Sequence, residues 1–293
     1  MLKLVILIIY FAVLIGIGLY CRKHATDVNG FVLGGRSVGP WLTAFAYGTS
    51  YFSAVVFVGY AGQFGWKYGI AATWAGIGNA IIGSLLAWVV LGRRTRIMSQ
   101  HLDSATMPQY FGKRFGSNPL KIGASVIIFI FLIPYTASLY NGLSRLFGMA
   151  FNIDYSVCII IMATLTAIYV IAGGYMATAI NDFIQGIIML FGIVAVIAAV
   201  IHSKGGFMSA LQGLANVSDP AVSDTPGIFA SFFGPDPFNL LCVVILTSLG
   251  TWGLPQMVQK FYAIDNEASI QKGTVISTIF ALIVSSSSHL KYR

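Results

Sequence analysis

Two hydrophobic stretches of this chain are each interrupted near their middle by small, helix-weakening residues. Backbone N–H and C=O groups cannot stay unpaired in lipid, so a break at mid-depth persists only where it lines a cavity whose ions or solute pair with the freed groups. The second break lies five spans after the first, so the two stretches cross the bilayer in opposite directions, as in inverted-repeat secondary transporters. The stretches are 41–62, interrupted at Gly48-Thr49-Ser50, and 238–261, interrupted at Gly250, Gly253 and Pro255.

The composition predicts an all-α polytopic membrane protein. Hydrophobic residues make up 57% of the 293 residues and charged residues 9%, whereas a soluble domain carries about 25% charged residues. A helical crossing needs about 20 apolar residues, and about eight windows qualify. They are 2–20, 41–62, 69–92, 122–148, 155–173, 177–201, 238–261 and 273–288. We expect one transmembrane domain over 1–293, with a first repeat at about 41–201 and a partial second repeat at about 238–288.

The net charge of +8 does not indicate nucleic acid binding, because the basic residues cluster in alternate short loops. If the spans are counted correctly, these loops face one compartment, which the positive-inside rule makes the cytoplasm. Both termini are then expected outside a cell membrane. The basic residues are Arg22, Lys23 and Arg36; Arg93, Arg94, Arg96, Lys113, Arg114 and Lys121; and Lys260 and Lys272.

The first break carries hydroxyl side chains at the centre of the bilayer. Thr49, Ser50, Tyr51 and Ser53 surround it, and hydroxyl and carbonyl oxygens suit Na⁺, a hard cation. Alternatively, Ser and Thr in membrane helices serve small-residue packing or donate to the preceding turn.

The second break, Thr247 to Pro255, combines a proline with two glycines and two threonines. Proline removes a backbone donor and frees a carbonyl one turn earlier. The break predicts a wall of the solute cavity, and a plain proline kink is the alternative.

Asp182 is the only acidic residue within a predicted span. An ionisable group there indicates function, although a helix cap or a structural hydrogen bond near the interface would also explain it. The paired acid and base groups that an intramembrane enzyme requires are missing, so we expect no enzyme.

Three segments resemble the sodium:solute symporter family, which includes proline, pantothenate, sialic acid and sugar symporters. They are 31–40 (Phe-Val-Leu-Gly-Gly-Arg-Ser-Val-Gly-Pro), 173–186 with Gly173-Gly174 and Asn181-Asp182, and 253–261 with Gly253-Leu254-Pro255. The resemblance implies a leucine-transporter-like fold with one extra N-terminal helix and an incomplete second repeat. It also implies Na⁺ as the coupling ion, a small organic solute as the cargo, and alternating access in the lipid bilayer.

The resemblance also implies roles for individual residues. The Na⁺ route would use Thr49, Phe52, Ser53 and Asp182. The solute cavity would be lined by residues at and beside both breaks, namely Ser50, Tyr51, Thr247, Thr251, Trp252 and Pro255.

Two departures from the family bear on function. Tyr51 stands where proline-type members often have an acidic residue, which resembles the pantothenate-type pattern. The family also continues for several more helices, so a truncated, non-transporting remnant or a sensory or assembly module is the alternative function. For the chain alone we expect insertion without Na⁺-coupled accumulation.

Overall fold

The computed structural model describes residues 2–52 and 61–288, and within them the chain forms helices and no β-strand. The first part contains α1 (Leu2–Cys21), η1 (Arg22–His24), α2 (Val28–Leu33), η2 (Gly34–Arg36) and α3 (Pro40–Tyr51). The middle contains α4 (Ala61–Tyr68), η4 (Gly69–Ala72), α5 (Thr73–Gly78), η5 (Asn79–Leu86), η6 (Trp88–Gly92), α6 (Arg93–His101), α7 (Met107–Phe115), α8 (Asn118–Phe151) and α9 (Tyr155–Ser203). The last part contains α10 (Phe207–Ala215), η7 (Ile228–Ala230), α11 (Pro237–Leu249), η8 (Gly250–Gly253), α12 (Pro255–Ala263) and α13 (Glu267–Ser288).

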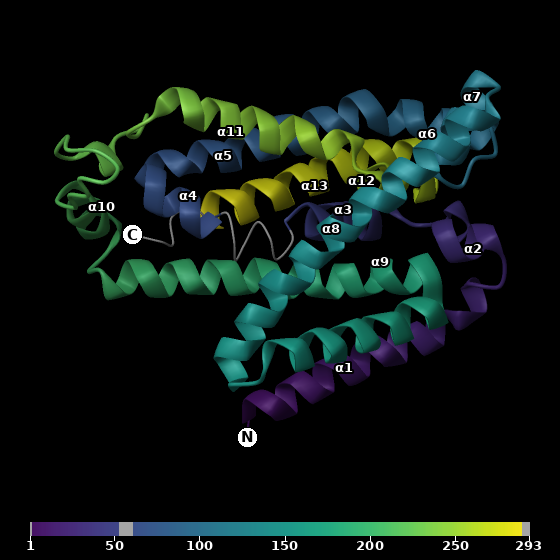
Figure 1. Ribbon diagram of the computed structural model, residues 1–293, viewed down its shortest axis with the longest axis horizontal. Helices are drawn as coiled ribbons and strands as arrows, with labels where there is room; N and C mark the ends of the chain where they lie inside the picture. The colour runs from purple at the N-terminus through teal and green to yellow at the C-terminus, as the bar shows by residue number, and fades with distance from the viewer. Residues whose placement is uncertain (1, 53–60, 289–293) are drawn as a thin grey trace.

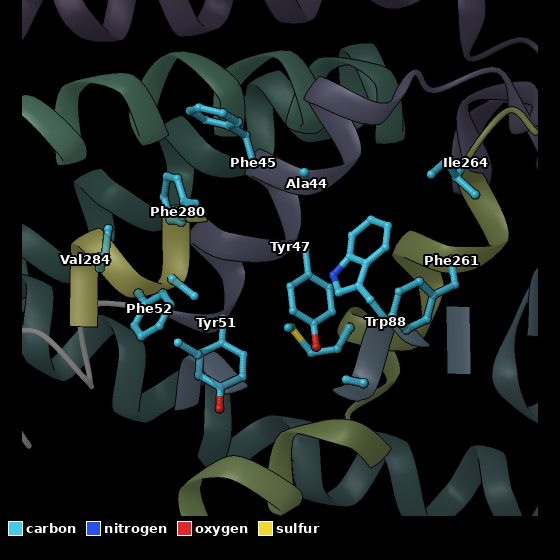
Figure 2. Close-up of a cluster of buried hydrophobic side chains, with 14 of the residues drawn as sticks. Ala44, Phe45, Tyr47, Tyr51, Phe52, Trp88, Phe261, Ile264, Phe280 and Val284 are labelled. Atoms are coloured by element: carbon cyan, nitrogen blue, oxygen red, sulfur yellow. The ribbon is translucent and has the colours of Figure 1, made fainter. Parts of the chain in front are cut away.

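Most of the long helices run along the longest axis of the molecule (Figure 1). Five of them, among the described residues, are long and apolar enough to cross a membrane, and the bent pair of α11 and α12 makes up to six. The aromatic core lies between α3, α12, α13 and η6, where Tyr47, Trp88, Phe261 and Phe280 are buried (Figure 2).

Helix α9 turns back on itself at Gly174, so that its two halves run in opposite directions (Figure 1). Gly174 has φ 55° and ψ −148°, a conformation that is essentially restricted to glycine. A Cβ there would also lie 2.8 Å from the backbone oxygen of Phe31 in α2. The turn separates the predicted spans 155–173 and 177–201 within this one helix.

Small residues bring α1 against the first half of α9. A Cβ at Gly18 would lie 2.8 Å from Tyr169 Cα, and a Cβ at Gly173 would lie 2.6 Å from the Gly18 oxygen. Close backbone approach at small residues is the usual way that membrane helices gain packing energy.

The first helix break is two residues later than predicted. Gly48, Thr49 and Ser50 are helical within α3, and the regular conformation ends at Phe52, with φ −91° and ψ 60°. Gly48 is required for packing rather than for unwinding, because a Cβ there would overlap the ring of Phe280 on α13. Ser53 lies outside the described residues.

The second break is confirmed. Helix α11 gives way to the 3₁₀ turn η8, Leu254 is extended at φ −69° and ψ 125°, and Pro255 begins α12 at a position where it needs no amide partner. The axis bends by 52° between these two helices.

The span predicted at 69–92 contains two π-helical segments, η5 and η6, which the sequence did not indicate. A π turn bonds residues five apart, and such turns occur often at functional sites.

The three basic loops meet at one end of the molecule, which agrees with the predicted loop pattern. Arg36 donates to the Ser99 and Ser104 oxygens at 3.2 and 2.9 Å. Arg96 donates to the Ile264 and Asp265 carbonyls at 2.6 and 2.9 Å. Burial lowers the pKa of the Arg36 guanidinium below its ordinary value, and nearby Asp103 opposes this shift.

Candidate solute and ion site

A buried asparagine connects the ends of the two broken helices. Asn79 is 5% exposed at the start of η5, and its Oδ1 atom accepts hydrogen bonds from three hydroxyls. Tyr51, at the end of α3, donates at 3.1 Å. Thr247 and Ser248, near the end of α11, each donate at 3.0 Å. We call these four residues the Asn79 cluster.

The π-helix adds two backbone acceptors beside the Asn79 cluster. The Gly83 carbonyl accepts from the Tyr47 hydroxyl at 2.9 Å, and the Ile82 carbonyl accepts from Trp252 Nε1 at 2.9 Å. Tyr47 belongs to α3 and Trp252 to η8, so η5 holds side chains from both broken helices. Figure 2 shows the Tyr47 ring between the rings of Tyr51 and Trp88.

Four of the six residues predicted for the solute cavity lie together here. Tyr51 bonds the Thr247 backbone oxygen at 3.1 Å and also forms a side-chain hydrogen bond with Thr251. Thr251 itself donates to the Ser248 carbonyl at 3.0 Å. Trp252 is connected to this group by its hydrogen bond to the Ile82 carbonyl. Ser50 is half-buried on α3 and Pro255 is the first residue of α12.

Of the residues predicted for Na⁺, Thr49 and Phe52 lie at the end of α3, Asp182 lies on α9, and Ser53 lies outside the described residues. The Thr49 hydroxyl donates to the Phe45 carbonyl at 2.9 Å, which is the bond to the preceding turn that the alternative anticipated. Phe52 is buried at the break, where its N–H donates to the Gly48 oxygen at 2.9 Å. Asp182 lies on the second half of α9.

Asp182 is paired with Lys260 of α12. Lys260 Nζ lies 3.4 Å from Asp182 Oδ2, and the two side chains are 8% and 22% exposed respectively. The Lys260 ammonium also lies 5.1 Å from the centre of the Tyr175 ring. The sequence did not indicate this contact, which brings Lys260 near the end of the broken helix to Asp182 on α9. It is a structural interaction of the kind that the alternative for Asp182 anticipated.

Two further buried amides lie close in sequence to this ion pair: Asn181 directly precedes Asp182, and Gln256 lies four residues before Lys260. Neither side-chain polar atom of Asn181 or of Gln256 has a hydrogen-bond partner among the described residues. Asn181 is 1% exposed. Each such group costs about 1–3 kcal/mol when left unpaired, so both are unexplained by the helix packing alone.

Sequence reasoning missed Asn79 and the role of Lys260. A signal for Asn79 was present, since it is the one amide in the apolar run from Gly78 to Leu86. Lys260 gave no such signal, because a lysine near the end of a hydrophobic stretch ordinarily reaches the membrane interface.

The comparisons with known proteins agree with this architecture. Residues 31–288 match the model of the sodium:solute symporter family, and the chain belongs to that family. It is 30% identical over 278 residues to the osmoregulated proline transporter OpuE of Bacillus subtilis, covering 94% of this chain and 54% of the relative. It is 32% identical over 282 residues to the sodium/proline symporter of Staphylococcus aureus, covering 92% of this chain and 51% of the relative.

The fold also matches a solved structure of a Na⁺-coupled sialic acid symporter in its substrate-bound outward-open state. The TM-score is 0.74 at 18% identity, and the match covers 100% of this chain and 61% of that one. The predicted leucine-transporter-like helical fold is thus confirmed. The chain is a multi-pass membrane protein of a transporter family rather than an enzyme, and it spans about half the length of the curated relatives it matches.

Proposed function

We propose that this chain takes part in Na⁺-coupled symport of a small organic solute, by alternating access around the two helix breaks. The single observation that carries the proposal is the Asn79 cluster, which gathers hydroxyls from both breaks at one point. A polar cluster inside an apolar bundle is the environment expected for a solute site. The names of the relatives favour proline as the first solute to test.

In this proposal the solute contacts residues beside the breaks, namely Ser50, Tyr51, Thr247, Thr251, Trp252 and Pro255. Na⁺ is held by oxygens near Thr49, Phe52 and Ser53 and passes Asp182 on the inner side. Thr49 would have to turn its hydroxyl lone pairs toward the ion while donating to Phe45. Coupling arises when ion and solute each stabilise the same state, so that each raises the affinity for the other.

The test is uptake of labelled proline into proteoliposomes with an inward Na⁺ gradient. One preparation carries the 293-residue chain. The other carries it fused to the part of the S. aureus sodium/proline symporter that the match leaves uncovered. We expect the fusion to take up roughly tenfold more proline with a Na⁺ gradient than with a K⁺ gradient. A correctly inserted fusion without Na⁺-dependent uptake of proline, pantothenate, sialic acid or sugars would contradict the proposal.

We further propose that the protein lies in the cell membrane with the basic end in the cytoplasm and both termini outside. Single cysteines replace exposed residues at the two ends, as Arg114→Cys and Asp224→Cys, in a Cys242→Ser background because Cys242 is exposed. In intact cells, an impermeant maleimide is expected to label Asp224→Cys and to label Arg114→Cys only after permeabilisation. The reverse pattern would overturn the orientation.

A further inference from the structure

We propose that Asn79 is the positioning residue that couples the two helix breaks, so that one side-chain oxygen fixes where the solute-site hydroxyls stand relative to each other. The inference rests on the proposed function for its solute, and on the geometry alone for the coupling. Neither break contains Asn79, which comes from η5, a segment that is hydrogen-bonded to side chains of both α3 and α11.

The argument begins with the hydrogen bonds. The break after α3 and the break after α11 are far apart in sequence, and Tyr51 and Thr247 meet at the same acceptor. An amide oxygen has two lone pairs, and three hydroxyls lie 3.0–3.1 Å from this one. Tyr51 also lies 3.1 Å from the Thr247 carbonyl, and Thr247 lies 2.9 Å from the Val243 carbonyl, so these two hydroxyls share their protons between Asn79 and the backbone. Removal of this oxygen would leave Tyr51 and Thr247 with backbone acceptors of α11, and the side-chain link between the two helices through η5 would be lost.

The glycines around Asn79 show that close approach is built into this helix. A Cβ at Gly78 would overlap the Val244 side chain of α11 and lie 3.3 Å from Ser248 Oγ. A Cβ at Gly83 would overlap the Tyr51 hydroxyl. Both broken helices therefore contact η5 over positions that have no side chain.

The π-helical geometry provides a second connection between the same elements. The Ile82 and Gly83 carbonyls accept side-chain donors, Trp252 from η8 and Tyr47 from α3. A movement of either broken helix thus has to break or carry along bonds to η5.

The experiment is a double-mutant cycle on the purified chain, read as the unfolding temperature in detergent. Asn79→Leu removes the acceptor at similar size, and Thr247→Val removes one donor. The control partner is Thr278→Val, whose hydroxyl donates within α13 to the Thr274 carbonyl at 2.7 Å. We expect Asn79→Leu and Thr247→Val together to lower the unfolding temperature by clearly less than the sum of their separate effects, and Asn79→Leu with Thr278→Val to be additive.

A second measurement separates positioning from general stability. The protein for this measurement is the fusion with the uncovered part of the S. aureus symporter. With labelled proline as the probe in Na⁺ buffer, Asn79→Leu in the fusion is expected to raise the Kd about tenfold. Asn79→Gln keeps an amide oxygen for the hydroxyls and adds no buried charge, so it is expected to restore part of the affinity. Equal proline affinity of the folded parent and the folded Asn79→Leu variant would overturn the proposal. Additivity of Asn79→Leu and Thr247→Val in the first cycle would overturn it as well. Coupling in the cycle without proline binding by the parent would instead contradict the proposed function and support the link between the breaks.

Discussion

Gly174→Ala is expected to lower the free energy of unfolding by about 3 kcal/mol or more. Glycine-only backbone conformations cost other residues about 1–3 kcal/mol, and Gly174 has φ 55° and ψ −148°. In addition, the new Cβ would lie 2.8 Å from the Phe31 oxygen and 3.0 Å from Phe31 Cα. The measurement is the loss of folded protein with temperature or denaturant in detergent micelles.

The matched control for this variant lies on the same helix. A Cβ at Gly192 would meet nothing within 4 Å, and alanine is better than glycine in a helix interior by about 1 kcal/mol. Gly192→Ala is therefore expected to be neutral or stabilising. Equal stability of the two variants would show that the reversal in α9 does not depend on the conformation of Gly174.

Disruption of the Asp182–Lys260 pair from one side is expected to have the second large effect. Removal of one partner from a buried ion pair typically costs about 3–5 kcal/mol, because the other charge is left uncompensated. Lys260 and Asp182 are 8% and 22% exposed, so solvent screens them little. Asp182→Asn and Lys260→Met alone should each destabilise the fold, while the double variant should recover most of the loss.

An exposed ion pair in the same chain is the control. Arg93 and Glu267 are 2.6 Å apart with side chains 70% and 50% exposed, and exposed pairs contribute about 0–1 kcal/mol. Arg93→Met and Glu267→Gln should therefore change stability little.

The Asp182→Asn/Lys260→Met double variant also tests the ion route. In the fusion transporter we expect this double variant to lose Na⁺ dependence, because the carboxylate on the inner route is gone. Unchanged Na⁺ dependence would remove Asp182 from the ion route.

The two interruptions show what could be predicted from the sequence. The break at Gly250 to Pro255 was predictable because proline and glycine weaken a helix through their own backbone chemistry, whatever surrounds them. The break near Gly48 was misplaced by two residues, since that glycine provides space for Phe280, a residue more than two hundred positions away. A single sequence does not distinguish a packing glycine from an unwinding one.

The candidate site divides in the same way. Hydroxyls at Tyr51, Thr247 and Thr251 were predictable as polar groups beside the breaks. Their common acceptor was not, because the contact with Asn79 depends on how η5 packs between α3 and α11. The repeat boundaries and the assignment of Na⁺ ligands stay predictions.

The 52° bend before α12 makes that helix a short lever. Lys260 is the sixth residue of α12, so at a rise of 1.5 Å per residue its backbone lies about 7–8 Å beyond the pivot at Pro255. A change of about ten degrees in the bend would displace it by roughly 1 Å. The contact to Asp182 is already 3.4 Å, so that displacement is enough to open it. The angle between α11 and α12 therefore decides whether Lys260 and Asp182 stay paired, and a change in that angle exposes both charges beside α9.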